Sequence, residues 1–234
     1  SKEWMHTDMG AQCGGGSCSG VYTTDTAPQL EYLINDSDSR FLIVENDEQL
    51  DKFLQVRDRM PGLAKVIVIE RDGLHGFSDP QVMFLDELYE IGAAYHAAHP
   101  EAFDAAIDAT TPDDTAILVY TSGTTGKPKG AMIRHGNLMY SVSAGLHDAP
   151  VYDTDDQLCF LPLCHILERV FSVNAPIAAA STINFAESPE TIFDNLQEVS
   201  PQTFVAVPRV WEKIYSQVAI RIGDATGVQR WAYA

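Results

Sequence analysis

The segment AILVYTSGTTGKPKG, residues 116–130, joins an apolar run to a stretch of glycines, hydroxyls and lysines. The run at 116–120 predicts a buried strand, because it is short and apolar throughout. The glycines that follow permit positive φ and let backbone N–H groups turn inward, the hydroxyls donate hydrogen bonds, and lysine neutralises negative charge. A loop of this composition directly after a buried strand predicts a binding site for a polyphosphate.

The same segment differs from the Walker A loop. Gly123 and Gly126 are too close together for that pattern, and no Ser or Thr follows Lys127. The alternative reading is a flexible, hydroxyl-rich turn without a ligand. The all-apolar strand in front of the loop, and two lysines inside it in a chain this acidic, disfavour that alternative.

Strand and helix patterns alternate along the rest of the chain. Strands are predicted at 40–45, 66–69, 116–120, 131–133, 157–161, 181–185 and 203–207. Helices are predicted at 26–34, 47–59, 82–98, 101–109 and 188–199, and from residues 137, 166 and about 210 onward. Residues 1–20, with consecutive glycines at 14–16, are predicted to be loop or the end of a broken element. The alternation predicts an α/β fold with doubly wound, mostly parallel sheets covered by helices.

Composition narrows the function classes. The 234 residues carry a formal charge of −18, and no Lys or Arg occurs between residues 72 and 126. Such a chain repels phosphate backbones, so nucleic acid is not an expected partner. No apolar run is long enough to cross a membrane, although a hydrophobic patch could still dock on one. The four cysteines are expected to be plain thiols rather than disulfides or metal ligands, which favours the cytoplasm.

Residues 120–130, called the signature loop below, resemble the signature loop of the adenylate-forming ligases, a superfamily that includes the acyl-CoA synthetases. Two further stretches resemble the long-chain fatty acid–CoA ligase branch. The segment LPLCHILER at 161–169 resembles its Leu-Pro-Leu-x-His-x-x-Glu-Arg stretch, and VPRVWEKI at 207–214 resembles its Val-Pro-Arg segment. The likeness covers nearly the whole chain and is poorest over residues 1–20.

This resemblance implies a reaction in two halves. A fatty acid carboxylate attacks the α-phosphorus of MgATP to give acyl-adenylate and pyrophosphate, and coenzyme A then displaces AMP. Lys129 is implied to be the main catalytic cation, with Lys127 auxiliary, and Thr121 is one candidate Mg²⁺ ligand. The implied ATP-binding residues are Thr121, Ser122, Gly123, Thr124, Thr125, Gly126, Lys127, Lys129 and Gly130.

His165 and Arg169 are implied to line the substrate pocket. The histidine of this stretch lies beside the acyl and adenylate pocket in the family, and the alternative is a structural histidine bonded to backbone. Arg169 stands where some relatives carry a tryptophan that gates the fatty-acid tunnel. It is expected to share a helix face with His165. Whether it gates, or pairs with Glu168 or another acid, stays open at this point.

The later motifs of the family do not occur in the sequence. The resemblance therefore implies that residues 1–234 are part of the large N-terminal domain, without the C-terminal lid and its catalytic lysine, and that this piece alone is inactive. Two other functions remain open. One is an adenylating ligase for another carboxylate, and the other is a truncated, non-catalytic nucleotide-binding module.

Overall fold

The computed structural model describes residues 1–121, 126–188 and 190–227. The chain divides into two compact units. The first contains Ser1–Pro150 and Pro162–Ala178, and the second contains Val151–Leu161 and Ala179–Ala234. Thr121, Lys129 and His165 all belong to the first unit, so one compact body carries these three residues of the predicted site.

One sheet of the first unit is parallel, in the order β2-β3-β4. Its strands are β2 (Phe41–Val44), β3 (Lys65–Val68) and β4 (Val82–Phe84). The helices α2 (Ala27–Asp36) and α3 (Asp47–Val56) pack against each other, and a 3₁₀ turn, η1 (Arg57–Arg59), follows α3. Parallel strands need a long crossover, and α3 supplies the one between β2 and β3. The predicted α/β alternation is confirmed here.

Side-chain caps lie at the N-termini of α2 and α3, close to the starts that the sequence predicts. The side-chain oxygen of Gln29 accepts a hydrogen bond from the Thr26 N–H at 2.8 Å, which closes half of a capping box in front of α2. The Asn46 side chain accepts from the Gln49 N–H at 3.2 Å and caps α3. Each cap satisfies an N–H group that the first helical turn would otherwise leave without a partner.

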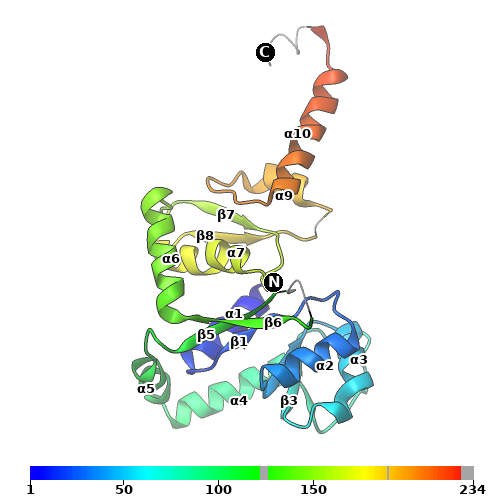
Figure 1. Ribbon diagram of the computed structural model, residues 1–234, viewed down its shortest axis with the longest axis vertical. Coiled ribbons are helices and arrows are strands. Elements are labelled where there is room, and N and C mark those ends of the chain that lie inside the picture. Colours follow the sequence, from blue (N-terminus) through cyan, green and yellow to red (C-terminus); the bar gives the residue numbers. More distant parts are fainter. Residues whose placement is uncertain (122–125, 189, 228–234) are drawn as a thin grey trace. The chain divides into compact units, whose positions relative to one another are not determined.

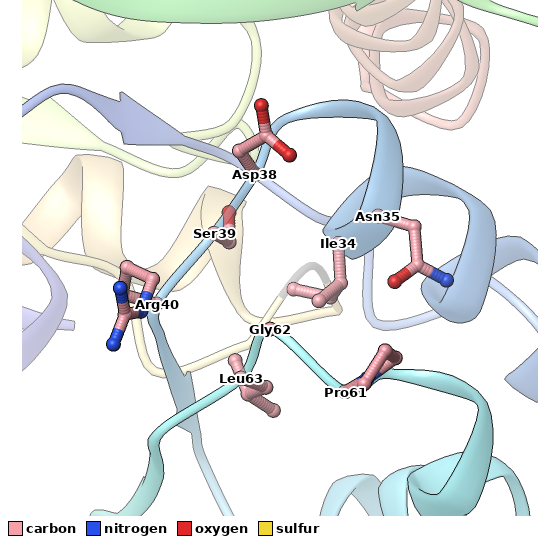
Figure 2. Close-up of a pocket in the computed structure, with 8 residues that line it drawn as sticks. All are labelled: Ile34, Asn35, Asp38, Ser39, Arg40, Pro61, Gly62 and Leu63. Atoms are coloured by element: carbon pink, nitrogen blue, oxygen red, sulfur yellow. The ribbon is translucent and has the colours of Figure 1, made fainter.

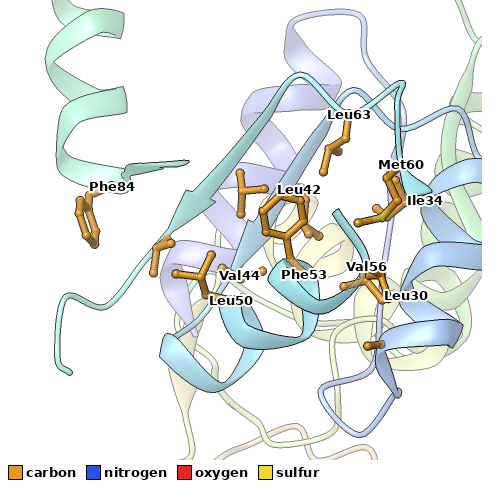
Figure 3. Close-up of a cluster of buried hydrophobic side chains, with 13 residues drawn as sticks. Leu30, Ile34, Leu42, Val44, Leu50, Phe53, Val56, Met60, Leu63 and Phe84 are labelled. Atoms are coloured by element: carbon orange, nitrogen blue, oxygen red, sulfur yellow. The ribbon is translucent and has the colours of Figure 1, made fainter. Parts of the chain in front are cut away.

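The core between these helices and the sheet is apolar (Figure 3). Leu50 and Phe53 of α3 are fully buried, as are Val66 and Val68 of β3. Burying one such side chain stabilises the fold by about 1.5–3 kcal/mol relative to leaving it in water. Figure 3 shows Leu50, Phe53 and Leu42 converging on the same space. This core holds α2 and α3 in place.

The second sheet of this unit has the order β1-β5-β6 (Figure 1). Its strands are β1 (Cys18–Ser19), β5 (Thr115–Thr121) and β6 (Lys129–Arg134). β1 pairs with β5 in parallel, whereas β5 and β6 are antiparallel. An antiparallel pair needs only a short connection, which the residues between Thr121 and Lys129 provide. The prediction of mostly parallel sheets holds, with this pair as the exception.

The sequence predicted one helix at residues 82–98, and this prediction is wrong. Residues 82–84 form β4 beside β3, and the helix α4 (Leu85–Ala98) begins after them. The side chain of Glu87 accepts from the Phe84 N–H at 3.2 Å, which places the helix start at this point. The next helix is α5 (Ala102–Ala109), close to the prediction.

The loop predicted for residues 1–20 is also wrong, because α1 (Lys2–Cys13) occupies most of that stretch. Its buried residues are Asp8 and Gln12, so the helix lacks the apolar stripe by which helices are recognised in a sequence. Asp8 pairs with the buried Arg169. A charge pair far apart in the sequence, rather than a hydrophobic face, attaches this helix.

Two helical segments follow the second sheet. The first is α6 (His135–Asp148), which continues directly from β6. The other is continuous but irregular: α7 (Ile166–Arg169), the π-helical turn η2 (Val170–Asn174) and α8 (Ala175–Ala179). α6 packs against η2. π-Helical turns of this kind occur frequently at functional sites.

The second unit has a two-stranded parallel sheet with helices after it. Its elements are β7 (Asp156–Cys159), β8 (Thr182–Phe185), α9 (Ile192–Val199) and α10 (Pro208–Gly223). The strand predicted at 203–207 is reduced to a single bridge between Thr203 and Gln157. Phe204 instead stacks on Phe160 and meets Trp211 edge-on, at 5.2 and 5.4 Å between ring centroids. The predicted helix at 188–199 begins later, at Ile192, after a turn.

In the described ranges, none of the helices has the length and apolar character needed to cross a bilayer.

Candidate functional site

The described part of the signature loop lies at the ends of two antiparallel strands. Thr121 is the last residue of β5, and it pairs across the sheet with Lys129, the first residue of β6. Both are exposed. Ser122, Gly123, Thr124 and Thr125, which the sequence assigns to phosphate binding, lie outside the described residues. The two strands therefore present Thr121 and Lys129 side by side at one edge of the sheet.

Two positions of this segment, Gly126 and Gly130, have a backbone conformation or a close contact that requires glycine. Gly126 has φ of +110°, a conformation that side chains other than glycine's rarely adopt. Gly130 faces Tyr120 across the sheet, and a Cβ added there would lie 3.1 Å from the Tyr120 ring. The absence of a side chain at Gly130 allows the Tyr120 ring to lie across the strand.

The lysines of the loop are exposed and make no ion pair within the described ranges. The Lys127 ammonium lies 4.8 Å from the centre of the Tyr32 ring, and Lys129 ends at the surface. In a chain with a charge of −18, two cations separated by one residue, without a carboxylate partner in the described ranges, leave their charge available to an anion. Lys127 and Lys129 therefore fit a phosphate group.

Helix α2 contacts both sides of the loop, which the sequence did not predict. The Tyr32 hydroxyl donates to the Pro128 carbonyl at 2.7 Å, and the Tyr120 hydroxyl donates to Asp36 Oδ2 at 2.8 Å. Burial raises the pKa of the Tyr120 phenol, and the adjacent Asp36 carboxylate raises it further. Both phenols therefore stay protonated at neutral pH and remain donors. The sequence places Tyr32 within the helix predicted at 26–34 and indicates no contact with the loop.

His165 is the N-cap of α7 and is exposed. Its Nδ1 accepts a hydrogen bond from the Leu167 N–H at 3.2 Å. An acceptor Nδ1 requires the neutral tautomer with the proton on Nε2, so the free side of the ring presents a donor. His165 precedes the helix rather than belonging to it, which differs from the expectation that it shares a face with Arg169.

Arg169 is almost fully buried, with 1% of its side chain exposed. Its Nε donates to Asp8 Oδ2 at 3.0 Å, a second guanidinium nitrogen bonds the other carboxylate oxygen, and the group lies 4.9 Å from the Trp4 ring. Of the alternatives left open above, the structure shows pairing with another acid. Beside this pair, burial is the main cause that raises the pKa of Cys18 to about 12. A role of Arg169 in a substrate pocket stays a prediction.

A small apolar cluster joins the two parts of the predicted site. It is formed around Ile117 of β5 and Leu138 of α6, and Ile166 of α7 and Val170 pack against it. The strand that ends in Thr121 and the helix that His165 caps therefore share one core. Such shared packing fixes both elements within the first unit.

An open hollow of about 520 Å³ lies elsewhere in the first unit (Figure 2). Its lining residues are Ile34, Asn35, Asp38, Ser39, Arg40, Pro61, Gly62 and Leu63. Arg40 and Leu63 precede β2 and β3, so the hollow lies at the amino ends of these parallel strands. Ligands of open α/β sheets bind at the carboxyl ends. The position of this hollow therefore does not favour it as the ligand site.

The chemistry of the described residues fits phosphate better than a metal ion bound by protein alone. In the ranges 1–121, 126–188 and 190–227, no three His, Cys, Asp or Glu side chains are grouped to hold a metal. Mg²⁺ prefers oxygen ligands and is often held by one or two protein groups together with substrate phosphates. The exposed Thr121 hydroxyl fits the protein part of such a set, and its role as a ligand stays a prediction.

A family model described as "AMP-binding enzyme" matches residues 1–231. The chain belongs to this family. This confirms the family that the signature loop indicated. Among curated relatives of this AMP-binding chain, the long-chain-fatty-acid–CoA ligase ACSBG1 of Bos taurus is 33% identical over 225 residues, which cover 93% of the chain and 30% of that protein. The long-chain-fatty-acid–CoA ligase ACSBG2 of Homo sapiens is 32% identical, covering 100% and 35%. The chain thus spans about a third of the length of these relatives.

Solved structures share the fold of this AMP-binding chain. A long-chain-fatty-acid–CoA ligase (FadD1) from Archaeoglobus fulgidus superposes with a TM-score of 0.70 at 18% identity, covering 96% of the chain and 41% of that protein. The anthranilate–CoA ligase AuaEII in complex with anthranoyl-AMP gives 0.69 at 20% identity, covering 87% and 38%. Ligases named for a fatty acid and for an aromatic acid are thus matched equally well, so the likeness is one of fold. The predicted α/β class is confirmed.

Proposed function

We propose that the chain is part of the large N-terminal domain of an ATP-dependent ligase that converts a long-chain fatty acid to its coenzyme A thioester. The observation that carries the proposal is that Lys127 and Lys129 are exposed beside Thr121 at the strand ends and form no ion pair with any carboxylate that the structure describes. Membership of the AMP-binding family and the names of the curated relatives support the reaction class and the acyl substrate.

In the first half-reaction, a carboxylate oxygen of the fatty acid forms a bond to the α-phosphorus of ATP. The bond from that phosphorus to the bridging oxygen of the β-phosphate breaks, and pyrophosphate leaves with the electron pair. In the second, the coenzyme A thiolate forms a bond to the acyl carbon, and AMP leaves. Mg²⁺, when bound, supplies positive charge to the phosphates.

The residues of this chain act on the charge that develops on pyrophosphate. Lys129 begins a strand, so its backbone is fixed, and only its side chain must adjust to the phosphates. We assign Lys129 as the catalytic cation, Lys127 as an auxiliary one and Thr121 as a phosphate and Mg²⁺ ligand. Gly126 and Gly130 allow the backbone conformation of the loop, and we assign residues 122–125 to the rest of the phosphate-binding site.

The remaining assignments concern the acyl side. His165 presents its Nε2–H donor at the start of α7, and we assign it to the acyl-adenylate pocket. Arg169 is assigned to the same pocket as a residue that shapes it from inside the core, since its charge is satisfied by Asp8. The proposal places the enzyme in the cytoplasm, with contact to a membrane surface as an additional property to be measured by vesicle sedimentation.

The test is Lys129→Ala in the full-length protein, measured by ATP–pyrophosphate exchange with a long-chain fatty acid. Removing a preorganised group that stabilises transition-state charge lowers the rate by about 100-fold or more. Lys2→Ala is the matched control, because Lys2 is 71% exposed and its ion pair in the described structure is with its neighbour Glu3. A Lys129→Ala exchange rate within threefold of the control would falsify the assignment of the loop.

The same assay separates the alternatives. Exchange that depends on an aryl or medium-chain acid, and not on a long-chain one, would point to a ligase for another carboxylate. ATP binding without exchange for any acid would point to a non-catalytic nucleotide-binding module.

A further inference from the structure

Two residues in the last turns of α2, Tyr32 and Asp36, contact the signature loop from outside. They lie four residues apart on one face of the helix, and the Tyr32 hydroxyl is 3.3 Å from Asp36 Oδ1. The Tyr32 hydroxyl contacts the loop after Gly126, at Pro128, and Asp36 contacts it before Gly126, at Tyr120. The two contacts therefore span the segment between the strands.

The donors and acceptors of this contact are matched. The Asp36 carboxylate accepts a hydrogen bond from the hydroxyl of Tyr120 at 2.8 Å. The Tyr32 hydroxyl has a single proton, which it directs to the Pro128 carbonyl at 2.7 Å rather than to the more distant carboxylate. Each bond depends on a hydroxyl or carboxylate that phenylalanine or alanine would lack.

The ring of Tyr32 makes a third contact, with the Lys127 ammonium at 4.8 Å. A cation over a tyrosine face is attracted by the ring quadrupole. This contact depends on the ring and not on the hydroxyl, so the two functions of Tyr32 can be separated by substitution.

We propose that Tyr32 and Asp36 are positioning residues that hold the signature loop in the conformation that binds the phosphates of ATP. The inference rests on the function proposed above. In the described part of the loop, β5 and β6 pair at Tyr120 with Gly130 and at Thr121 with Lys129, and Lys127 and Pro128 lie just before β6 begins. Contacts that fix Tyr120, Lys127 and Pro128 before ATP arrives lower the entropic cost of binding, so their loss weakens ATP binding. Neither side chain needs to touch ATP itself.

The experiment measures KM for ATP, KM for the fatty acid and kcat in full-length Tyr32→Phe and Asp36→Ala variants. Loss of one such hydrogen bond is expected to raise KM for ATP about three- to tenfold, with KM for the fatty acid unchanged. Asp36→Asn retains an acceptor oxygen and should recover most of the loss. The matched controls are Tyr140→Phe, at a position 77% exposed on α6, and Asp51→Asn on the exposed face of α3.

Lys127 provides a second measurement. Tyr32→Leu removes both the hydroxyl and the ring, so it should raise KM for ATP more than Tyr32→Phe does. In a Lys127→Ala background the two Tyr32 variants should be equal, because no cation remains over the ring. A difference that persists in this background would overturn the assignment of the ring contact.

The outcomes also separate this inference from the function on which it rests. If Lys129→Ala leaves pyrophosphate exchange unchanged, the proposed function fails. If Lys129→Ala abolishes exchange while Tyr32→Phe and Asp36→Ala leave KM for ATP unchanged, only the positioning role fails. Equal increases in KM for ATP and for the fatty acid would show a general structural role and would also overturn it. Should Asp36→Ala not fold, the isosteric Tyr32→Phe variant decides alone.

Discussion

Removing Asp8 should release helix α1 from the rest of the first unit. The side chains of Asp8 and Arg169 are 3% and 1% exposed, so Asp8→Ala leaves a buried guanidinium without its counter-charge. One guanidinium nitrogen, Nη1, already lacks a hydrogen-bond partner among the described residues, and the Trp4 ring beside the group carries no charge to replace the carboxylate. Breaking a buried pair from one side costs about 3–5 kcal/mol. At about 1.4 kcal/mol per tenfold, the equilibrium for opening α1 shifts at least about 100-fold.

The measurement is hydrogen–deuterium exchange of peptides that cover residues 2–13 in the full-length protein, under conditions where exchange reports the opening equilibrium. Protection there should fall about 100-fold in Asp8→Ala, while peptides from α3 keep their protection. The double variant Asp8→Leu with Arg169→Met should recover most of it, since replacing both charges by apolar groups is often neutral. Unchanged protection of α1 in Asp8→Ala, or a double variant as unprotected as the single one, would refute the reasoning.

Two further predictions concern acid stability and loop geometry. The pKa of Asp79 is lowered mainly by its hydrogen bond from the Arg57 guanidinium and, second, by one from the Gln81 N–H. The Asp79–Arg57 pair therefore stabilises the fold at neutral pH, and this contribution is lost as pH falls below about 4. The melting temperature of Asp79→Asn should thus lie below that of wild type at pH 6 and converge with it towards pH 3; a constant gap contradicts the assignment. Gly126→Ala meets no steric obstacle, yet a non-glycine residue at its φ of +110° costs about 1–3 kcal/mol. It should raise KM for ATP about tenfold in exchange kinetics, whereas Gly145→Ala in α6 should not; equal values for the two variants would show that the backbone conformation is irrelevant.

The parallel sheet and its helices could be predicted because each local signal agrees with the final packing. The apolar run at 40–45 forms β2, and the run at 66–69 gives β3. The sequence placed the start of α3 at Asp47, and the cap is its neighbour Asn46, through a contact three residues away. When propensity, capping and burial indicate the same element, the structure follows the pattern.

Helix α1 and strand β4 could not be predicted for a different reason. Helix α1 buries Asp8 and Gln12, and the partner of Asp8 is 161 residues away in the chain. Periodicity measures apolar faces, so a helix attached by a buried ion pair gives no signal. The residues of β4 continue the helical spacing of α4, and only the neighbouring strand β3 makes them extended. Tertiary pairing overrides local propensity in that case.

The candidate site divides in the same way. The sequence identified the residues expected to touch the phosphates, because glycines, hydroxyls and lysines in one segment have a common chemistry. The residues that hold this segment, Tyr32 and Asp36, come from a helix 96 and 84 residues earlier than their partners Pro128 and Tyr120. Tyrosine and aspartate are common in helices, so the residue types give no signal. Their contact with the loop is what indicates a role. A ligand-binding segment can therefore be read from composition, whereas its supporting contacts need the fold, which is why the Tyr32→Phe variant tests the structure rather than the resemblance.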